Sequence, residues 1–178
     1  MKKFVKKHSI EILGKFLDAR KAQRVRLDGF VGSYMRSHKS IGPKEMTFIS
    51  ENVFDIVRNL ELVKHLAGSR GQDAETLFTT YARRDLAEER RNASLAPQTR
   101  FSIHPELIAR LESALGRRDA FAVAEISCQR PPLTVRADPG RTSRSELMKK
   151  FVLEHHFSIK KTRLAEHGIS FLANPMVR

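Results

Sequence analysis

Between positions 43 and 68, apolar side chains recur at steps of three and four residues, the spacing that places them on one face of an α-helix. The residues in this pattern are Ile49, Val53, Ile56, Val57, Leu60 and Val63. Pro43 stands where a first helical turn tolerates proline, and Gly68 stands where a helix commonly ends. The pattern predicts one continuous amphipathic helix, which must bury its apolar face against other elements.

Weaker stripes of the same kind predict further helices on both sides of this segment. They cover residues 10–21, 25–37, 73–91, 105–116 and 117–127. Residues 92–100 are polar and include Pro97, which interrupts the periodicity, so this segment is predicted to be a linker. We therefore expect one domain in residues 1–95 and a second, beginning with helices, in residues 100–178.

The pattern changes after residue 130. Pro131-Pro132 disfavours helix, and the alternation from Leu133 to Arg136 predicts a strand. Ser143 followed by Glu146 forms a capping box, which begins a helix. Residues 157–163 and 169–172 are predicted to be two further strands. The expected fold class is therefore mainly α, a helical bundle followed by a small α+β unit of order β-α-β-β.

Composition excludes several classes of protein. No apolar run is long enough for a membrane span, and the first residues do not have the pattern of a signal peptide. The single Cys128 rules out an internal disulfide and any multi-cysteine zinc site. We expect a cytoplasmic protein with no membrane partner.

Charge is strongly basic and unevenly placed. The chain has 33 Lys and Arg against 20 Asp and Glu, a formal net charge of +13. Residues 1–70 carry +8, residues 71–130 carry 0, and residues 131–178 carry +5. A dense polyanion such as RNA is the partner that best matches two basic ends. The predicted RNA-binding residues are Lys15, Arg20, Lys21, Arg24, Arg26, Arg136, Arg141, Arg144, Lys149, Lys150, Lys160, Lys161 and Arg163.

The 178-residue sequence contains none of the common motifs for catalysis or cofactor binding. There is no Gly-x-Gly-x-x-Gly, Walker loop, His-Glu-x-x-His or Gly-x-Ser-x-Gly. Cys128 is expected to be a small buried residue, and His155-His156 a surface pair. The aromatic residues Phe151, Phe157 and Phe171 are expected to be core. We predict no catalytic, cofactor-binding or metal-binding residue in this chain.

Three segments, in order, are similar to a known family. Ile41-Gly42-Pro43-Lys44-Glu45, within the stretch from Tyr34 to Arg58, resembles an Ile-Gly-x-x-(Asp/Glu) turn that starts a helix there. His104 to Gly116 is similar to a Pro-x-Trp-Leu helix. Pro131 to Asp138 closely resembles a Pro-Pro-Leu-x-Leu-Arg-Val-Asn strand, and Thr142 to Leu147 the helix start after it. All three resemble segments of the amino-terminal half of the Sun/Fmu-type ribosomal RNA cytosine-5 methyltransferases.

The resemblance implies a NusB-like RNA-binding region in residues 1–95 and a ferredoxin-like or RNA-recognition-like half after it. It implies a substrate-recognition portion for ribosomal RNA, inactive alone. The complete enzyme uses S-adenosylmethionine and two cysteine motifs, Pro-Cys and Thr-Cys, and neither motif occurs in these residues. The methyltransferase domain would be separate or deleted.

The chain also departs from the family. Asp138 replaces the usual Asn, and Pro139-Gly140 replaces an apolar-Lys pair. Two alternatives therefore stay open: a standalone NusB-like RNA-binding module of antitermination type, and a basic module that binds an acidic protein.

Overall fold

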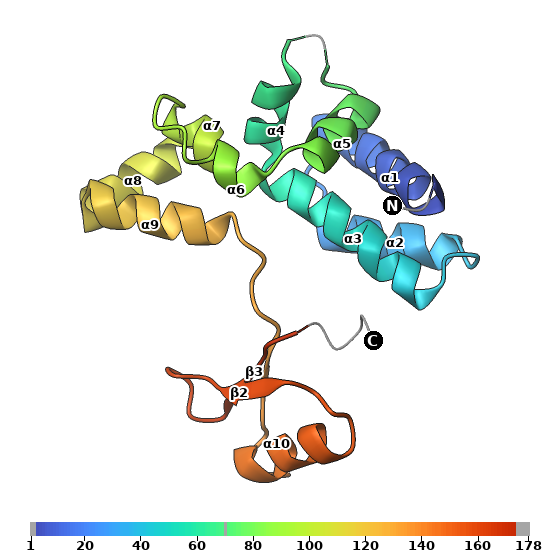
Figure 1. The fold of residues 1–178 in the computed structure, drawn as a ribbon, viewed down its shortest axis with the longest axis vertical. Helices are drawn as coiled ribbons and strands as arrows, with labels where there is room; N and C mark the ends of the chain where they lie inside the picture. Colours follow the sequence, from blue (N-terminus) through green and yellow to red (C-terminus); the bar gives the residue numbers. More distant parts are fainter. Residues whose placement is uncertain (1–2, 70, 174–178) are drawn as a thin grey trace. The chain divides into compact units, whose positions relative to one another are not determined.

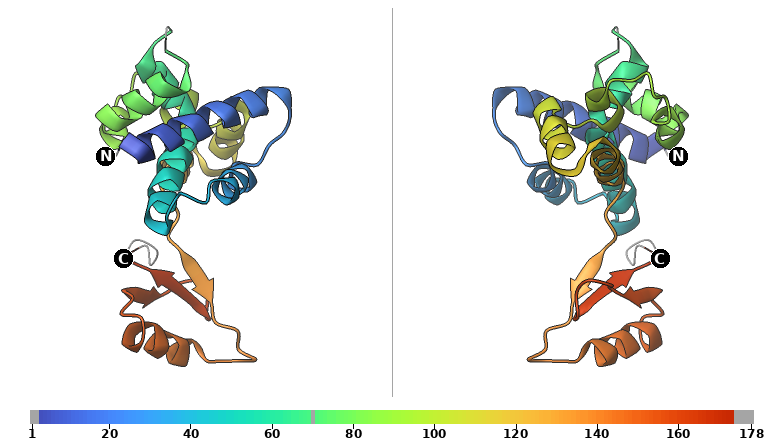
Figure 2. Two further views of the ribbon diagram at one scale, coloured as in Figure 1. Left: turned by 90° about the vertical axis from the view of Figure 1, so that its right-hand side faces the viewer. Right: turned by 90° about the vertical axis from the view of Figure 1, so that its left-hand side faces the viewer.

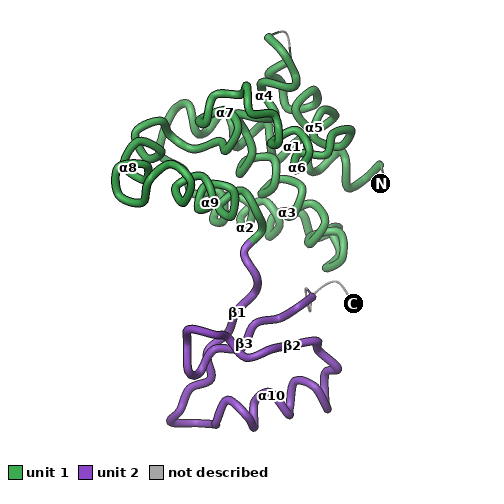
Figure 3. The backbone as a smooth tube through the Cα atoms, turned by 60° about the vertical axis from the view of Figure 1, so that its left-hand side comes forward, with its two compact units in different colours: residues 1–130 green, residues 131–178 purple. Residues whose placement is uncertain are grey.

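A computed structural model describes residues 3–69 and 71–173, which are mainly helical with one small antiparallel sheet (Figure 1). The chain forms two compact units, residues 1–130 and residues 131–178 (Figure 3). No helix in the described ranges is long and apolar enough to cross a membrane.

The first unit is entirely helical over its described residues. Its helices are α1 (Lys3–Ala22), α2 (Leu27–Ser37), α3 (Pro43–Arg58), α4 (Leu60–Ala67), α5 (Ala74–Arg83), α6 (Leu86–Glu89), α7 (Pro97–Phe101), α8 (Pro105–Leu115) and α9 (Arg117–Ser127). The predicted helices at 25–37, 105–116 and 117–127 are confirmed, and so is the helix predicted at 10–21, although it begins earlier, at Lys3. Gly68 and Gly116 end helices with a φ of 75°, a conformation that favours glycine.

Helix α1 is the centre of the first unit because it contributes to two apolar clusters. Ile12 packs with Ile49 and Val53 of α3 and with residues of α2. Its neighbour Leu13 packs instead with Leu62 of α4 and Phe78 of α5. All six side chains are at most 1% exposed. Neighbouring helical residues point about 100° apart, so one helix can serve both clusters.

The prediction of one continuous helix from 43 to 68 is wrong, because the helix is interrupted at Asn59, between α3 and α4. This buried side chain donates from Nδ2 to the Asp55 carbonyl at 2.9 Å, and its Oδ1 accepts from Arg90 Nη1 at 2.8 Å. Helix α4 begins at the next residue, and the side chain of Ser102 caps its first turn. Ser102 Oγ accepts hydrogen bonds from the backbone N–H groups of Glu61 and Leu62 at 3.1 and 3.2 Å. The apolar spacing continues through the break, so periodicity alone did not reveal it.

The predicted helix 73–91 is also two helices. Helix α5 begins close to the predicted start, with Asp73 as its N-cap, but Arg84 is extended. Asp85 then caps α6 by accepting from the N–H groups of Ala87 and Glu88 at 2.9 and 3.3 Å. A second N-capping aspartate, Asp85, therefore lies inside the predicted helix and marks the start of a separate helix, α6.

The division between the two units differs from the predicted one at 95–100. Helix α7 begins inside the predicted linker, and Phe101 at its end is 2% exposed. Phe101 packs with Ile108, Ala124 and Cys128 in a third apolar cluster. Arg90 is joined to α9 by an ion pair of 3.1 Å with Glu125. These contacts attach α7, α8 and α9 to the first unit, so the boundary falls after residue 130.

The second unit has the predicted order β-α-β-β. Its elements are β1 (Thr134–Arg136), α10 (Arg144–Leu153), β2 (Ile159–Lys161) and β3 (Gly168–Phe171). The capping box of Ser143 and Glu146 is present in full. The sheet order is β1-β3-β2 with both pairs antiparallel, and α10 lies along the sheet (Figure 2).

Candidate nucleic-acid interface

The sheet of the second unit has one face against α10 and one face without a helix. Phe171 of β3 contacts Phe151 of α10 with ring centroids 5.4 Å apart, so Phe171 lies on the helix side. Successive strand residues point to opposite faces, which places Ser170 on the other side. Ser170 pairs with Thr134 on β1 and with Lys160 on β2. Since α10 is the only helix among the described residues of this unit, the face carrying Thr134, Ser170 and Lys160 has no helix over it; we call it the open sheet face.

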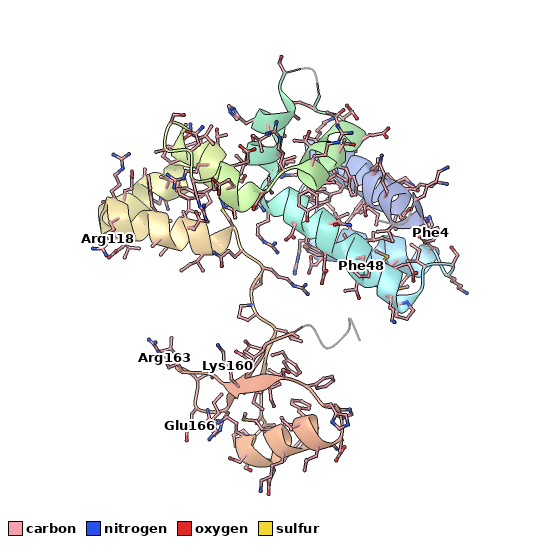
Figure 4. The ribbon with its side chains drawn as sticks, in the orientation of Figure 1. Phe4, Phe48, Arg118, Lys160, Arg163 and Glu166 are labelled. Carbon is pink, nitrogen blue, oxygen red and sulfur yellow. The ribbon has the colours of Figure 1, made fainter. Side chains whose placement is uncertain are left out.

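The open sheet face is polar and basic. Thr134, Arg136 and Lys160 are exposed, and Figure 4 shows Lys160 on the side of β2 away from α10. The hydroxyls of Thr134 and Ser170 share a hydrogen bond of 3.0 Å. Over the part of the chain that the structure describes, Arg136 and Lys160 form no ion pair, so their charges are available to a ligand.

A tight turn brings two more cations to one end of the sheet. Thr162 donates from Oγ1 to the Ala165 carbonyl at 2.6 Å and from its backbone N–H to the Gly168 carbonyl at 3.0 Å. Gly168 permits this approach, since a Cβ there would lie 2.2 Å from Thr162 Oγ1. The turn carries the exposed Arg163, and Arg144 Nη1 donates to the Ala165 carbonyl at 3.4 Å.

The remaining predicted residues of this unit are separated from that group. Lys161 follows Lys160 and therefore points to the helix side of the sheet. Lys149 is two residues from Phe151, whose ring contacts Phe171 of the sheet, and therefore lies about 200° around α10 from that side. Arg141 pairs with Asp138 at 3.5 Å and Lys150 with Glu154 at 4.0 Å. The structure thus brings together Arg136, Lys160, Arg163 and Arg144, but not Lys161, Lys149, Arg141 and Lys150.

The predicted residues near the end of α1 do not form one basic face. Three of them are paired with acidic neighbours: Lys15 with Glu11 at 2.7 Å, Lys21 with Asp18 at 2.9 Å, and Arg26 with Asp28 at 2.9 Å. Arg20 and Lys21 border a hollow of about 610 Å³ between α1, α4 and α5, which Asp18, Glu61 and Asp73 also line. Arg20 and Arg24 are the members of this set without an ion pair in the described ranges.

Ionisation supports a structural role for the capping box and for Cys128. Hydrogen bonds from the backbone and hydroxyl of Ser143 lower the pKa of Glu146, so this carboxylate stays charged at the start of α10. Burial raises the pKa of the Cys128 thiol, which is 4% exposed and donates to the carbonyls of Phe101 and Ala124. Its expected burial is confirmed, and a raised pKa disfavours the thiolate form.

The expectations for the histidine pair and for the phenylalanines of the second unit are confirmed only in part. His155 and His156 are exposed, as expected of a surface pair. Phe171 is buried, whereas Phe151 and Phe157 are half-buried. Within residues 3–69 and 71–173, no group of three or more His, Cys, Asp or Glu side chains could hold a metal ion.

Sequence reasoning missed the hydroxyl residues of the open sheet face. Thr134 and Ser170 are ordinary polar residues in the sequence, and they do not lie near each other along the chain. Strand alternation shows on which side each one lies within its own strand, but only the pairing of β1 and β2 with β3 joins them into one surface.

No protein-family model matches this chain, and neither the curated proteins nor the solved structures searched contain a match.

Proposed function

We propose that this chain binds RNA through the open sheet face of its second unit, as the substrate-recognition portion of an S-adenosylmethionine-dependent ribosomal RNA cytosine-5 methyltransferase. The observation that carries the proposal is a group of cations on and beside that face that form no ion pair within the described residues: Arg136, Lys160, Arg163 and Arg144. The exposed hydroxyl of Thr134 lies on the same face as the first two of these cations, so the surface offers both charge and hydrogen bonding to a sugar-phosphate backbone.

Electrostatics favours a nucleic acid as the ligand. Residues 131–178 carry a net charge of +5, and binding to phosphates would release condensed counterions. The methyltransferase context comes from the sequence resemblance alone. In that context the first unit would be the NusB-like bundle, and a separate domain would hold S-adenosylmethionine and the two cysteines. The purified chain alone would then transfer no methyl group to RNA.

The test is RNA binding over a salt series, measured by fluorescence anisotropy with a labelled ribosomal RNA fragment. We expect the double variant Arg136→Gln/Lys160→Gln to weaken binding. The slope of log affinity against log salt should become shallower by about 0.7–0.9 for each phosphate that the variant no longer neutralises. Circular dichroism should show an unchanged fold, because both side chains are exposed.

The matched control removes two positive charges elsewhere. Arg110→Gln/Arg117→Gln changes exposed arginines that pair with Glu106 and Glu112 in the electrically neutral middle of the chain. It should leave the salt slope unchanged. If both double variants behave alike, the open sheet face is not the site; if no RNA binds at low salt, an acidic protein becomes the better candidate partner.

A further inference from the structure

We infer that the RNA bound by the second unit is a base-paired helix, recognised through its phosphates and 2′-hydroxyls and not through stacked bases. The inference rests on the proposed function and names the substrate class for the same surface. It comes from where the aromatic side chains of this unit lie.

The phenylalanine rings of the second unit are packed against one another on the helix side of the sheet. Residues 131–178 contain three Phe and no Tyr or Trp. The centroid of the Phe151 ring lies 6.0 Å from that of Phe157 and 5.4 Å from that of Phe171, and the Phe157 and Phe171 centroids are 5.5 Å apart. The His155 ring stacks on Phe157 at 5.3 Å, at the same end of α10. The three Phe rings lie on the helix side of the sheet, where Phe171 is buried and Phe151 and Phe157 are half-buried, so they cannot serve as a platform on the opposite face.

The open sheet face therefore lacks the feature that single strands need. Proteins that bind single-stranded nucleic acid combine a basic groove with aromatic rings on which successive bases stack. The strand register gives this face Thr134, Arg136, Lys160, Gly168 and Ser170. An RNA helix keeps its bases stacked inside and presents phosphates and 2′-hydroxyls across a wide, shallow minor groove. The side chains of the open sheet face match those groups.

Thr134 is the residue placed to distinguish RNA from DNA. It is exposed, and its Oγ1 shares a hydrogen bond with Ser170 and lies 3.4 Å from the Pro132 carbonyl. A hydroxyl has one donor and two acceptor positions, so Thr134 keeps an acceptor position for a 2′-hydroxyl. Arg136, two residues along the same strand, would reach a phosphate of either nucleic acid.

The experiment compares three probes with the full chain over the same series of salt concentrations. They are an RNA duplex of about 16 base pairs, the DNA duplex of the same sequence, and an unstructured pyrimidine RNA with the same number of phosphates. We expect the RNA duplex to bind most tightly. Thr134→Val should reduce the preference for RNA over DNA duplex by about five-fold, the effect of one hydrogen bond, without changing the salt slope. Thr134→Ser, which keeps the hydroxyl, should retain the preference.

Arg136→Gln separates this inference from the proposed function. It should weaken binding to both duplexes equally and make the salt slope shallower. Tighter binding of the single strand, equal binding of both duplexes, or no effect of Thr134→Val would overturn the duplex inference while RNA binding stands. No binding of any probe at low salt, or binding indifferent to Arg136→Gln, would instead overturn the proposed function.

Discussion

His8 is a titratable residue inside the contact between α1 and α2. It is 8% exposed, and its Nδ1 lies 2.8 Å from the Tyr34 hydroxyl. The Tyr34 ring stacks on His38, with centroids 3.9 Å apart and an interplanar angle of 14°. Burial is the main cause that lowers the pKa of His8; His38 and Lys7 also lower it, whereas Glu11 raises it. The neutral imidazole is therefore the form that the fold favours.

Acidification should destabilise the first unit through His8. The unfolded chain takes up a proton near the ordinary histidine pKa of about 6.5, before the folded chain does, so the free energy of unfolding falls as the pH drops through that value. Urea unfolding at about pH 7.5 and about pH 5.5 measures this loss. His8→Gln should lose less stability than the parent chain over the same interval. Equal losses would show that His8 does not contribute.

Helices α3 and α4 show how an element boundary can depend on a distant residue. Ser102 ends α7 in the left-handed conformation with a φ of 50°, and its hydroxyl caps the first turn of α4. The two backbone N–H groups that donate to this hydroxyl belong to residues about 40 positions earlier in the chain. Such a cap satisfies donors that have no partner within their own helix.

Removal of this cap should lower the free energy of unfolding by about 0.5–2 kcal/mol, the usual contribution of a capping hydroxyl. Ser102→Ala tests it by urea denaturation. Ser102→Gly removes the hydroxyl but suits the positive φ, so it separates the loss of the cap from backbone strain. Ser145→Ala, at an exposed serine of α10, should change stability by less than about 0.5 kcal/mol. If Ser102→Gly is as stable as the parent chain, the hydroxyl is not an effective cap.

At the scale of the whole molecule, the division into units determines which fragments can fold. A fragment ending at residue 95 loses Ser102 as the cap of α4 and Glu125 as the partner of the buried Arg90. It also loses Phe101, which packs α7 against α8 and α9. A fragment ending at residue 130 keeps all of these interactions.

We expect residues 1–130 to unfold cooperatively on heating, with a midpoint close to that of the same transition in the full chain. Residues 1–95 should show a broad, weakly cooperative loss of helicity. Circular dichroism at a helix band measures both. Equally sharp transitions for the two fragments would instead favour a boundary between the two units at residues 95–100.

Local features were predictable because their causes lie within a few residues. Pro43 at the start of α3, Gly116 at the end of α8 and the capping box of Ser143 and Glu146 each depend on the backbone of the same or the next turn. The β-α-β-β order followed from alternation and turn residues for the same reason. The four cations of the candidate interface are among the thirteen basic residues that charge alone predicted to bind RNA.

Contacts between distant residues decided the rest. The break at Asn59 depends on Arg90 and Ser102, which stand 31 and more positions away, and no local pattern marks such partners. The pairing of the strands placed Lys160 on the open sheet face and Lys161 on the helix side, and it joined Thr134 to Ser170. A side chain's charge can be read from the chain, but its face and its neighbours are set only when separate segments pack together.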